Sequence, residues 1–445
     1  MSLTRALPAK NSGNQDDPLR PIPFRQLSPG SYASRLAWLG SSCFVTASGG
    51  ETYLLNLGPC LINAQPLLGS NWKELLEVKP RNEDLLVPNR QATVEWVLLE
   101  QPRLRAEVQC VSATPVDGGH DGHRRWLVAC VDALGTLTVS CLEITPDKET
   151  LQLRTRSSFT VTGTDSSWTH HGPACCALTH GGPSGAASSP YIAVARYFPC
   201  NVSVYQGELL VRHVRTLEHP TSVVFGTGST ATSSHVRPEP NEHHELLYLT
   251  EGPSVTMCDL RAPGVATRRK IIGGHGTTQS SGTVSWYGCD LSGYELALVG
   301  PERCVLVVDV RRWAVLGRWW SCLKYDATTV LLGYKTLSGK DHSDPSSRLM
   351  YVNGQDNEMA CGTWVSTDSD PLLRRSGEPG RQTEGVDRLN NTPMLRQIGL
   401  QRTGGRLFGF RADERWVGAT LWHDNGWAGL TARGVLYTME KPAFG

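Results

Sequence analysis

The feature that most constrains this chain is the period of its apolar residues, which is two along almost its whole length. Runs of about five to eight residues alternate between apolar and polar side chains or are wholly apolar, and Gly, Pro, Ser or Asp bounds them. About seventeen such runs follow one another, including CFVTASG, YIAVAR, LLYLTEG, ELALVG, VLVVDV and WVGATLW. Residues 71–79 are the one moderate helix candidate. The pattern, together with 45 glycines for turns, predicts an all-β chain.

One strand unit recurs along the chain. It has an apolar strand, a second strand that ends in small residues, a third strand that often ends in an acidic or amide residue, and a basic fourth strand. The unit is clearest at 283–319, recurs at 221–272 and is weaker at 174–218. The expected third strands begin near Tyr53, Leu137, Val202, Val255, Val305, Met359 and Val435. This spacing predicts seven units of one architecture, because internal self-similarity is the signature of repeat folds.

These units resemble the blades of the WD-repeat β-propeller family, which carry a Gly-His before the first strand and a Trp-Asp at the end of the third. Asp259 and Asp309 occupy the Asp position, and His219 and His275 lie near the His position. The resemblance covers residues 22–440, and the third strands end in CD, VD, LN, YQ or TW where the family has WD. It implies an all-β, seven-bladed WD-type β-propeller in which these Asp and His residues are structural turn residues.

The seventh unit bears on how such a ring would close. It reaches Gly445 without a fourth strand, so we expect an N-terminal strand at 21–27, PIPFRQL, to complete it, since closure removes open sheet edges. Residues 1–20 are expected to form a disordered tail, and residues 21–445 a single propeller. Insertions are expected at 59–91, 226–243 and 367–404. An irregular two-domain β protein is the alternative.

Charge and cysteine content narrow the class of partner and the compartment. The chain has 43 Lys and Arg against 42 Asp and Glu, a net charge of +1, which argues against nucleic acid or anionic lipid as a partner held by bulk charge. Residues 1–30 lack the apolar core of a secretory signal, and the apolar runs are far shorter than the roughly 20 residues of a membrane span. The 13 cysteines lie mostly in apolar stretches. We therefore expect a protein without membrane insertion in a reducing compartment, cytoplasmic or nuclear.

Motifs for metals, nucleotides and catalysis fail on spacing. One segment is dense in nitrogen and sulfur donors, namely His170, His171, Cys175, Cys176 and His180. The chain has no C-x-x-C, however, and adjacent residues of a strand point to opposite faces. The segments 273–282 and 333–341 lack the glycine order of phosphate loops, and no G-x-S-x-G is present. We expect no metal, no cofactor and no enzymatic activity.

Two D-x-R elements are the sharpest local feature. Asp259-Leu260-Arg261 and Asp309-Val310-Arg311 each follow the third strand of successive units. They resemble the W-D-x-R boxes of WD proteins that act as substrate receptors of cullin-RING ubiquitin ligases, where the Arg faces the ligase's propeller adaptor. Cys258 and Val308 replace the aromatic residue here. The alternative is local, because an Asp can accept backbone N–H bonds in a tight turn while the Arg lies in solvent.

Basic and aromatic side chains near the fifth unit supply further candidates for partner binding. An exposed Trp on its outer strand would anchor an interface, whereas a buried one would belong to the core. The candidate partner-binding residues are Arg261, Arg311, Arg312, Trp313, Trp319 and Trp320. We expect a non-catalytic scaffold that mediates protein–protein interactions in a multiprotein assembly, with other proteins, subunits of a large complex, as partners. The alternative is a substrate receptor of a cullin-RING ubiquitin ligase.

Overall fold

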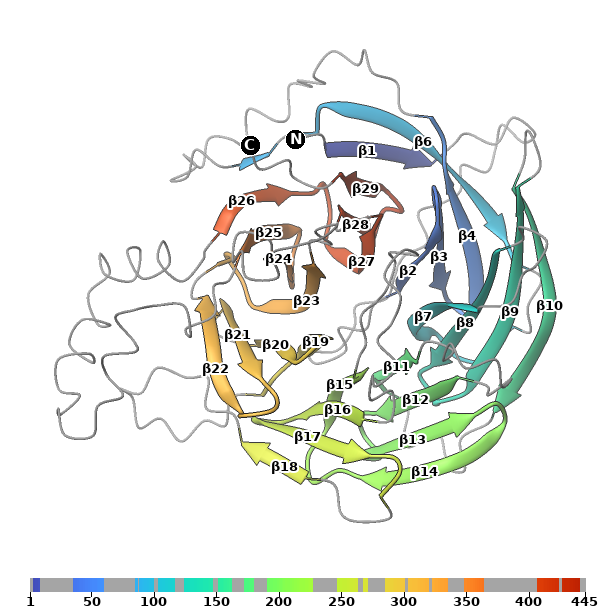
Figure 1. Ribbon diagram of the computed structural model, residues 1–445. Coiled ribbons are helices and arrows are strands. Elements are labelled where there is room, and N and C mark those ends of the chain that lie inside the picture. The colour runs from blue at the N-terminus through green and yellow to red at the C-terminus, as the bar shows by residue number, and fades with distance from the viewer. Residues whose placement is uncertain are drawn as a thin grey trace, which may run out of the picture.

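The regular structure of the chain consists of β-strands arranged as sheets around a common centre (Figure 1). The computed structural model describes residues 3–8, 35–59, 85–86, 88–99, 103–116, 124–146, 151–161, 172–179, 190–226, 246–262, 267–270, 285–300, 303–319, 322–334, 348–363, 406–423 and 426–440. Within them no α-helix occurs, and so none that is long and apolar enough to cross a membrane. The expected all-β class is confirmed, and the helix candidate at 71–79 lies outside the described residues.

Four of the sheets contain four strands each and follow chain order. Their strands are β7 (Val108–Val116), β8 (Arg124–Asp132), β9 (Leu137–Pro146) and β10 (Leu151–Val161); β11 (Ala174–Leu178), β12 (Tyr191–Arg196), β13 (Asn201–Gln206) and β14 (Leu209–Arg215); β15 (Pro220–Phe225), β16 (Leu246–Glu251), β17 (Ser254–Asp259) and β18 (Thr267–Lys270); and β19 (Gly288–Ser292), β20 (Glu295–Gly300), β21 (Cys304–Asp309) and β22 (Ala314–Trp319). Gly207 (φ 59°) and Gly293 (φ 58°) form tight turns after β13 and β19, because glycine adopts this left-handed conformation without steric cost.

Two further sheets are larger. One has five strands, β23 (Ala327–Tyr334), β24 (Arg348–Gly354), β25 (Glu358–Thr363), β26 (Arg406–Arg411) and β5 (Leu85–Leu86), of which β5 pairs in parallel with β26. The other has eight strands in the order β2 (Leu36–Gly40), β3 (Cys43–Ser48), β4 (Glu51–Leu57), β6 (Arg90–Leu98), β1 (Leu3–Pro8), β29 (Leu436–Met439), β28 (Gly426–Thr431) and β27 (Trp416–Trp422). Within this sheet β1 joins the two ends of the chain, because it is antiparallel to β29 and parallel to β6.

The position of β1 differs from one expectation and leaves another untested. The strand that pairs with the end of the chain is Leu3–Pro8, which lies within the segment expected to be a disordered tail at 1–20. The expected closing strand at 21–27 lies outside the described residues. The physical reason is burial: Leu3 packs in the same core as Met439, and Ala6 in the same core as Leu436. These contacts tie β1 to β29.

The innermost strands form a closed circuit. In this circuit β2 lies beside β7, and then β11, β15, β19, β23 and β27 follow until β27 lies beside β2 again. Apolar cores fill the spaces between neighbouring sheets, as where Val307 of β21 packs with Val330 and Leu332 of β23. Strands such as β21 are buried on both faces for this reason, which explains why the residues of β21 before Asp309 are all apolar. The expected insertions at 226–243 and 367–404 lie almost wholly outside the described residues, and β5 and the start of β6 lie within 59–91.

Candidate partner-binding site

The two D-x-R elements adopt the same closed geometry at the ends of β17 and β21. Arg261 donates from Nε to Asp259 Oδ1 over 3.0 Å and from Nη2 to Oδ2 over 2.9 Å, and its backbone N–H donates to Oδ1 over 3.0 Å. Arg311 makes the same three bonds to Asp309, over 3.1, 2.7 and 2.9 Å. Each aspartate therefore caps a turn and holds its own arginine in a bidentate pair. The next residue along, Arg312, is exposed.

Pairing sets the charge that these turns present. The hydrogen bonds from Arg261 lower the pKa of Asp259 to about 2, and those from Arg311 lower the pKa of Asp309. Both arginine side chains are exposed, by 51% and 56%, and Arg311 lies over the ring of Tyr294 at 4.3 Å from its centroid. A partner at this face would meet two neutral ion pairs rather than two bare cations.

The tryptophans of the fifth unit occupy different environments. Trp313 has a left-handed backbone (φ 55°), and its backbone N–H donates to Asp309 O over 2.6 Å. Its side chain is half-buried, with the ring centroid 6.5 Å from that of Tyr248. Trp319 is only 2% exposed and packs in the core between two sheets. Contrary to the expectation, it cannot act as an exposed anchor, because strand alternation turns it toward β23. Trp320 lies outside the described residues.

His219 contributes to a turn rather than to a chemical site. Its Nδ1 lies 2.9 Å from Tyr197 O and 3.2 Å from Cys200 Sγ, and its ring stacks on that of Tyr197. A carbonyl oxygen only accepts, so Nδ1 carries the proton and donates to Tyr197. These contacts tie the loop before β15 to the turn between β12 and β13. His275, its expected counterpart, lies outside the described residues.

Three buried carboxylates that the sequence analysis missed organise the opposite ends of the strands. Glu251 Oε2 accepts the N–H of Leu217 over 2.7 Å, and Glu358 Oε2 accepts that of Lys324 over 2.6 Å. Asp132 Oδ2 accepts the backbone N–H of Ala106, in the loop before β7, over 3.3 Å. Each carboxylate lies where the second strand of a sheet meets the third, and each holds the loop that leads into the first strand of that sheet. The available signal was an acidic residue at this junction in three different units.

An exposed apolar patch lies at the same strand ends as these carboxylates. We call Tyr197, Phe198, Leu217 and His219 the Phe198 patch. Leu217 is 77% exposed and Phe198 47%, while the Phe198 ring lies edge-on to that of His219 at 6.1 Å. Large apolar side chains that gather in the open typically mark an interaction surface. The Phe198 patch and the D-x-R turns lie at opposite ends of the strands, so they face different partners or different parts of one.

Comparison with known proteins bears on the fold. No family model matches the sequence, and no curated protein does. A chain in the crystal structure of the mitotic checkpoint complex is similar, with a TM-score of 0.51 and 8% identity over 97% of this chain and 99% of that one. The similarity extends over nearly the whole of both chains, which agrees with the single closed circuit that the innermost strands form. The fold is a WD-repeat-like β-propeller.

Two further solved structures are similar to this propeller. One is Sqt1 from Chaetomium thermophilum bound to the N-terminus of the ribosomal protein L10, with a TM-score of 0.47 and 11% identity over 90% of this chain and 81% of that chain. The other is the WD40 β-propeller domain of Doa1, with a TM-score of 0.48 and 9% identity over 94% of this chain and 96% of that chain.

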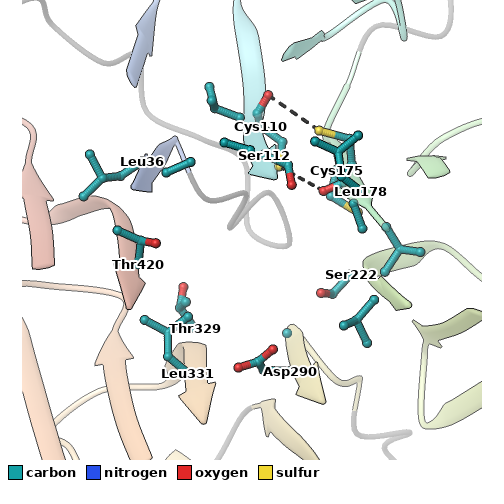
Figure 2. Close-up of a pocket in the computed structure, with 18 of the residues that line it drawn as sticks. Leu36, Cys110, Ser112, Cys175, Leu178, Ser222, Asp290, Thr329, Leu331 and Thr420 are labelled. Atoms are coloured by element: carbon teal, nitrogen blue, oxygen red, sulfur yellow. Dashed lines mark hydrogen bonds between the residues drawn. The ribbon is translucent and has the colours of Figure 1, made fainter. Parts of the chain in front are cut away.

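The innermost strands of the propeller surround a central cavity of about 230 Å³. Figure 2 shows Ser112, Ser222, Thr329 and Thr420 around the cavity, with Asp290 at one side. Asp290 is the one carboxylate among the lining residues. Burial raises its pKa to about 7, although the backbone N–H of Leu291 in the same strand donates to Oδ1 and that of Leu332 in β23 donates to Oδ2.

The cysteine thiols that line this central cavity are poorly suited to act as nucleophiles. Cys110 donates to Cys176 O over 3.7 Å, Cys176 donates to Ala129 O over 3.7 Å, and Cys289 donates to Ser222 Oγ over 3.5 Å. Burial raises the pKa of Cys289 to about 12 and that of Cys175 well above its ordinary value. Among the residues that the structure describes, no three or more His, Cys, Asp or Glu side chains come close enough to hold a metal ion.

Proposed function

We propose that this propeller is a non-catalytic scaffold that binds other proteins within a multiprotein assembly. The observation that carries the proposal is the Phe198 patch. Its Phe198 ring is 47% exposed and contacts the stacked rings of Tyr197 and His219, and Leu217, 77% exposed, lies in the same loop as His219. Aromatic side chains are enriched at protein interfaces, and apolar side chains that cluster on the surface mark interaction sites. The near balance of charge supports proteins rather than nucleic acid as partners.

The patch stands on a fixed support, which favours tight binding. The N–H of Leu217 donates to Glu251, and that of Thr216 donates to the turn between β12 and β13 over 2.9 Å. The ring of Phe198 rests against Gly172, where any Cβ would clash with it. A loop that is already ordered loses little conformational entropy when a partner binds, so more of the contact energy appears as affinity.

We propose further that the ring has seven blades. The eight-stranded sheet divides into two sets of four antiparallel strands, β2-β3-β4-β6 and β27-β28-β29-β1, which meet only through the parallel pairing of β1 with β6. Counting each set as one blade adds two to the five separate sheets. The circuit of innermost strands supports the same number, since one strand from each set takes part in it.

We propose the cytoplasm or nucleus as the compartment. Every cysteine that the structure describes is a reduced thiol, and most are buried in the cores between sheets. Disulfides form and persist in oxidising compartments, so a chain whose described cysteines form no disulfide suits a reducing one.

A role as substrate receptor of a cullin-RING ubiquitin ligase is the second candidate. One observation favours it: Arg261 and Arg311 have the same geometry at the same position of successive sheets. The pairing of each arginine with its own aspartate weighs against it, since that pairing occupies the donors best placed for a partner. The two candidates use opposite ends of the strands and are therefore separable by mutation.

Affinity purification with quantitative mass spectrometry tests the scaffold proposal. The variant combines Leu217→Asp with Phe198→Ser, and the matched control is Tyr325→Ser, an aromatic residue of similar exposure in the loop before β23. We expect the double variant to lose a defined set of partners and the control to keep them, with unchanged melting curves for both. An identical set of partners from all three proteins would overturn the Phe198 patch as the binding site.

A further inference from the structure

The outer strand of the β11–β14 sheet, β14, has an edge that no described strand pairs with. It is hydrogen-bonded to β13 on one side and is the last strand of its sheet (Figure 1). An edge strand of this kind presents a row of backbone N–H and C=O groups that can pair with another strand.

The first half of β14 is unusually apolar for an exposed edge. Leu209, Leu210 and Val211 are 70%, 44% and 41% exposed, although they are consecutive. A register shift between the pairs Tyr205–Leu210 and Val204–Arg212 leaves Val211 without a partner in β13, which explains why the usual burial of alternate residues is lost.

The equivalent outer strand of the β19–β22 sheet, β22, has a different surface. In β22 the large apolar residues Leu316 and Trp319 are buried, and the exposed positions hold Ala314 and Arg318. Natural proteins blunt exposed edges with charges, prolines or short strands. The first half of β14 has neither a charge nor a proline, so it differs from a protected edge.

The second half of β14 carries the charge that selects the occupant. Arg215 is exposed and has no carboxylate partner among the described residues, while Arg212 reaches Cys258 of the neighbouring sheet. A second copy of this strand fits poorly, because antiparallel pairing centred on Arg212 would set this residue against itself and Leu209 against Arg215. Charge complementarity instead favours a segment with acidic residues opposite Arg215.

We infer that β14 accepts an extended segment of a partner protein as an added strand, in which apolar residues cover Leu209, Leu210 and Val211 and acidic residues face Arg215. Backbone hydrogen bonds to the open edge would supply affinity, and the side chains would set the direction and register of the segment. The site adds a second binding surface to the proposed scaffold. Its apolar half lies at the far end of β14, and its Arg215 end adjoins the Phe198 patch, because Arg215 pairs with Asn201.

The test uses the purified full chain and a displayed library of random linear peptides about twelve residues long. We expect selection to enrich peptides in which an apolar run adjoins acidic residues. The variant Leu209→Lys with Leu210→Lys should weaken their binding by about tenfold or more, and Arg215→Glu by a similar factor. The controls Ala314→Lys, on the other edge strand, and Phe198→Ser, which changes the Phe198 patch without changing its charge, should bind them as the original protein does.

Hydrogen exchange separates strand addition from side-chain contact alone. Bound peptide should slow the exchange of the amides of β14 that face away from β13, and those of β22 should exchange as before. The inference is overturned if no selected peptide is sensitive to the β14 variants, or if sensitive peptides bind without protecting these amides. Because the Phe198→Ser control reports on the Phe198 patch separately, such a result leaves the test of the scaffold proposal intact.

Discussion

Arg35 Nη1 donates a hydrogen bond to Glu107 Oε1 over 2.9 Å, and this ion pair links the start of β2 to the start of β7. The arginine side chain is fully buried, whereas the glutamate is 23% exposed. Burial lowers the pKa of Arg35, and the hydrogen bond that Arg35 donates to Glu107 partly offsets this shift. The pair therefore holds two neighbouring blades together at a point where a lone charge would be costly.

Removing one partner of this pair should destabilise the protein more than replacing the other. Glu107→Ala leaves a buried cation without its carboxylate, so the free energy of unfolding should fall by about 2–4 kcal/mol. Arg35→Met removes the charge itself and fills similar space, and should cost about 1 kcal/mol. Urea unfolding of both variants measures the difference. Equal losses would show that the ion pair matters only for its packing.

Closure of the ring through β1 makes a second prediction. Ala6 is buried between β29 and β6, so Ala6→Asp should bury a carboxylate and lower the thermal midpoint by many degrees. Arg5→Ala on the same strand removes only the partly exposed ion pair with Asp413 and should change the midpoint little. Differential scanning calorimetry measures both. If the two variants melt alike, β1 does not seal the ring.

Much of this architecture follows from the sequence because the decisive interactions are local. Strand alternation and turn residues placed the third strands at positions that fall in or next to β4, β9, β13, β17, β21, β25 and β29. The strand β1 escaped because its partner β29 lies at the far end of the chain, and six residues without a clear turn signal carry no sign of that pairing. Non-local pairing of this kind is decided by closure and not by local preference.

The site was harder to predict than the fold for the same physical reason. The D-x-R turns were recognisable since Asp309 and Arg311 bind each other across two residues. The carboxylate of Glu251 holds a loop more than thirty positions earlier, and the exposure of Leu217 depends on that loop. Trp319 shows the limit in the other direction, because the sequence placed it on an outer strand and the neighbouring blade buries it.

Asp290, which lines the central cavity, should make the free energy of unfolding depend on pH. Its pKa is raised by burial to about 7 in the folded protein, above its unfolded value, so the native state holds this proton more tightly. Stability from this group is therefore full below about pH 4 and is lost as pH rises toward 7. Asp290→Asn should remove that loss and be relatively more stable than the original protein at pH 8 than at pH 5, by on the order of 2 kcal/mol. Denaturation curves at the two pH values check this, and parallel curves would contradict it.

Variants of the D-x-R turns should have separate effects on folding stability and on partner binding. Asp309→Ala removes the acceptor of a turn N–H and should cost about 1 kcal/mol of stability. Arg261→Ala with Arg311→Ala removes exposed pairs that contribute little to folding, so the melting curve should stay in place. If a partner reads both arginines, the double variant loses it, and a cullin adaptor among the lost proteins would establish the ligase role. A full set of retained partners would leave the D-x-R pair as turn chemistry alone.

The most direct test of the scaffold role is site-specific photo-crosslinking in cells. Benzoylphenylalanine replaces Leu217 in one protein and Tyr325 in another, both exposed and both in loops that lead into an innermost strand. The account predicts that position 217 crosslinks to a small, reproducible set of proteins that position 325 does not capture, and that Phe198→Ser reduces the yield. The absence of crosslinks from position 217, or the same products from both positions, would contradict it.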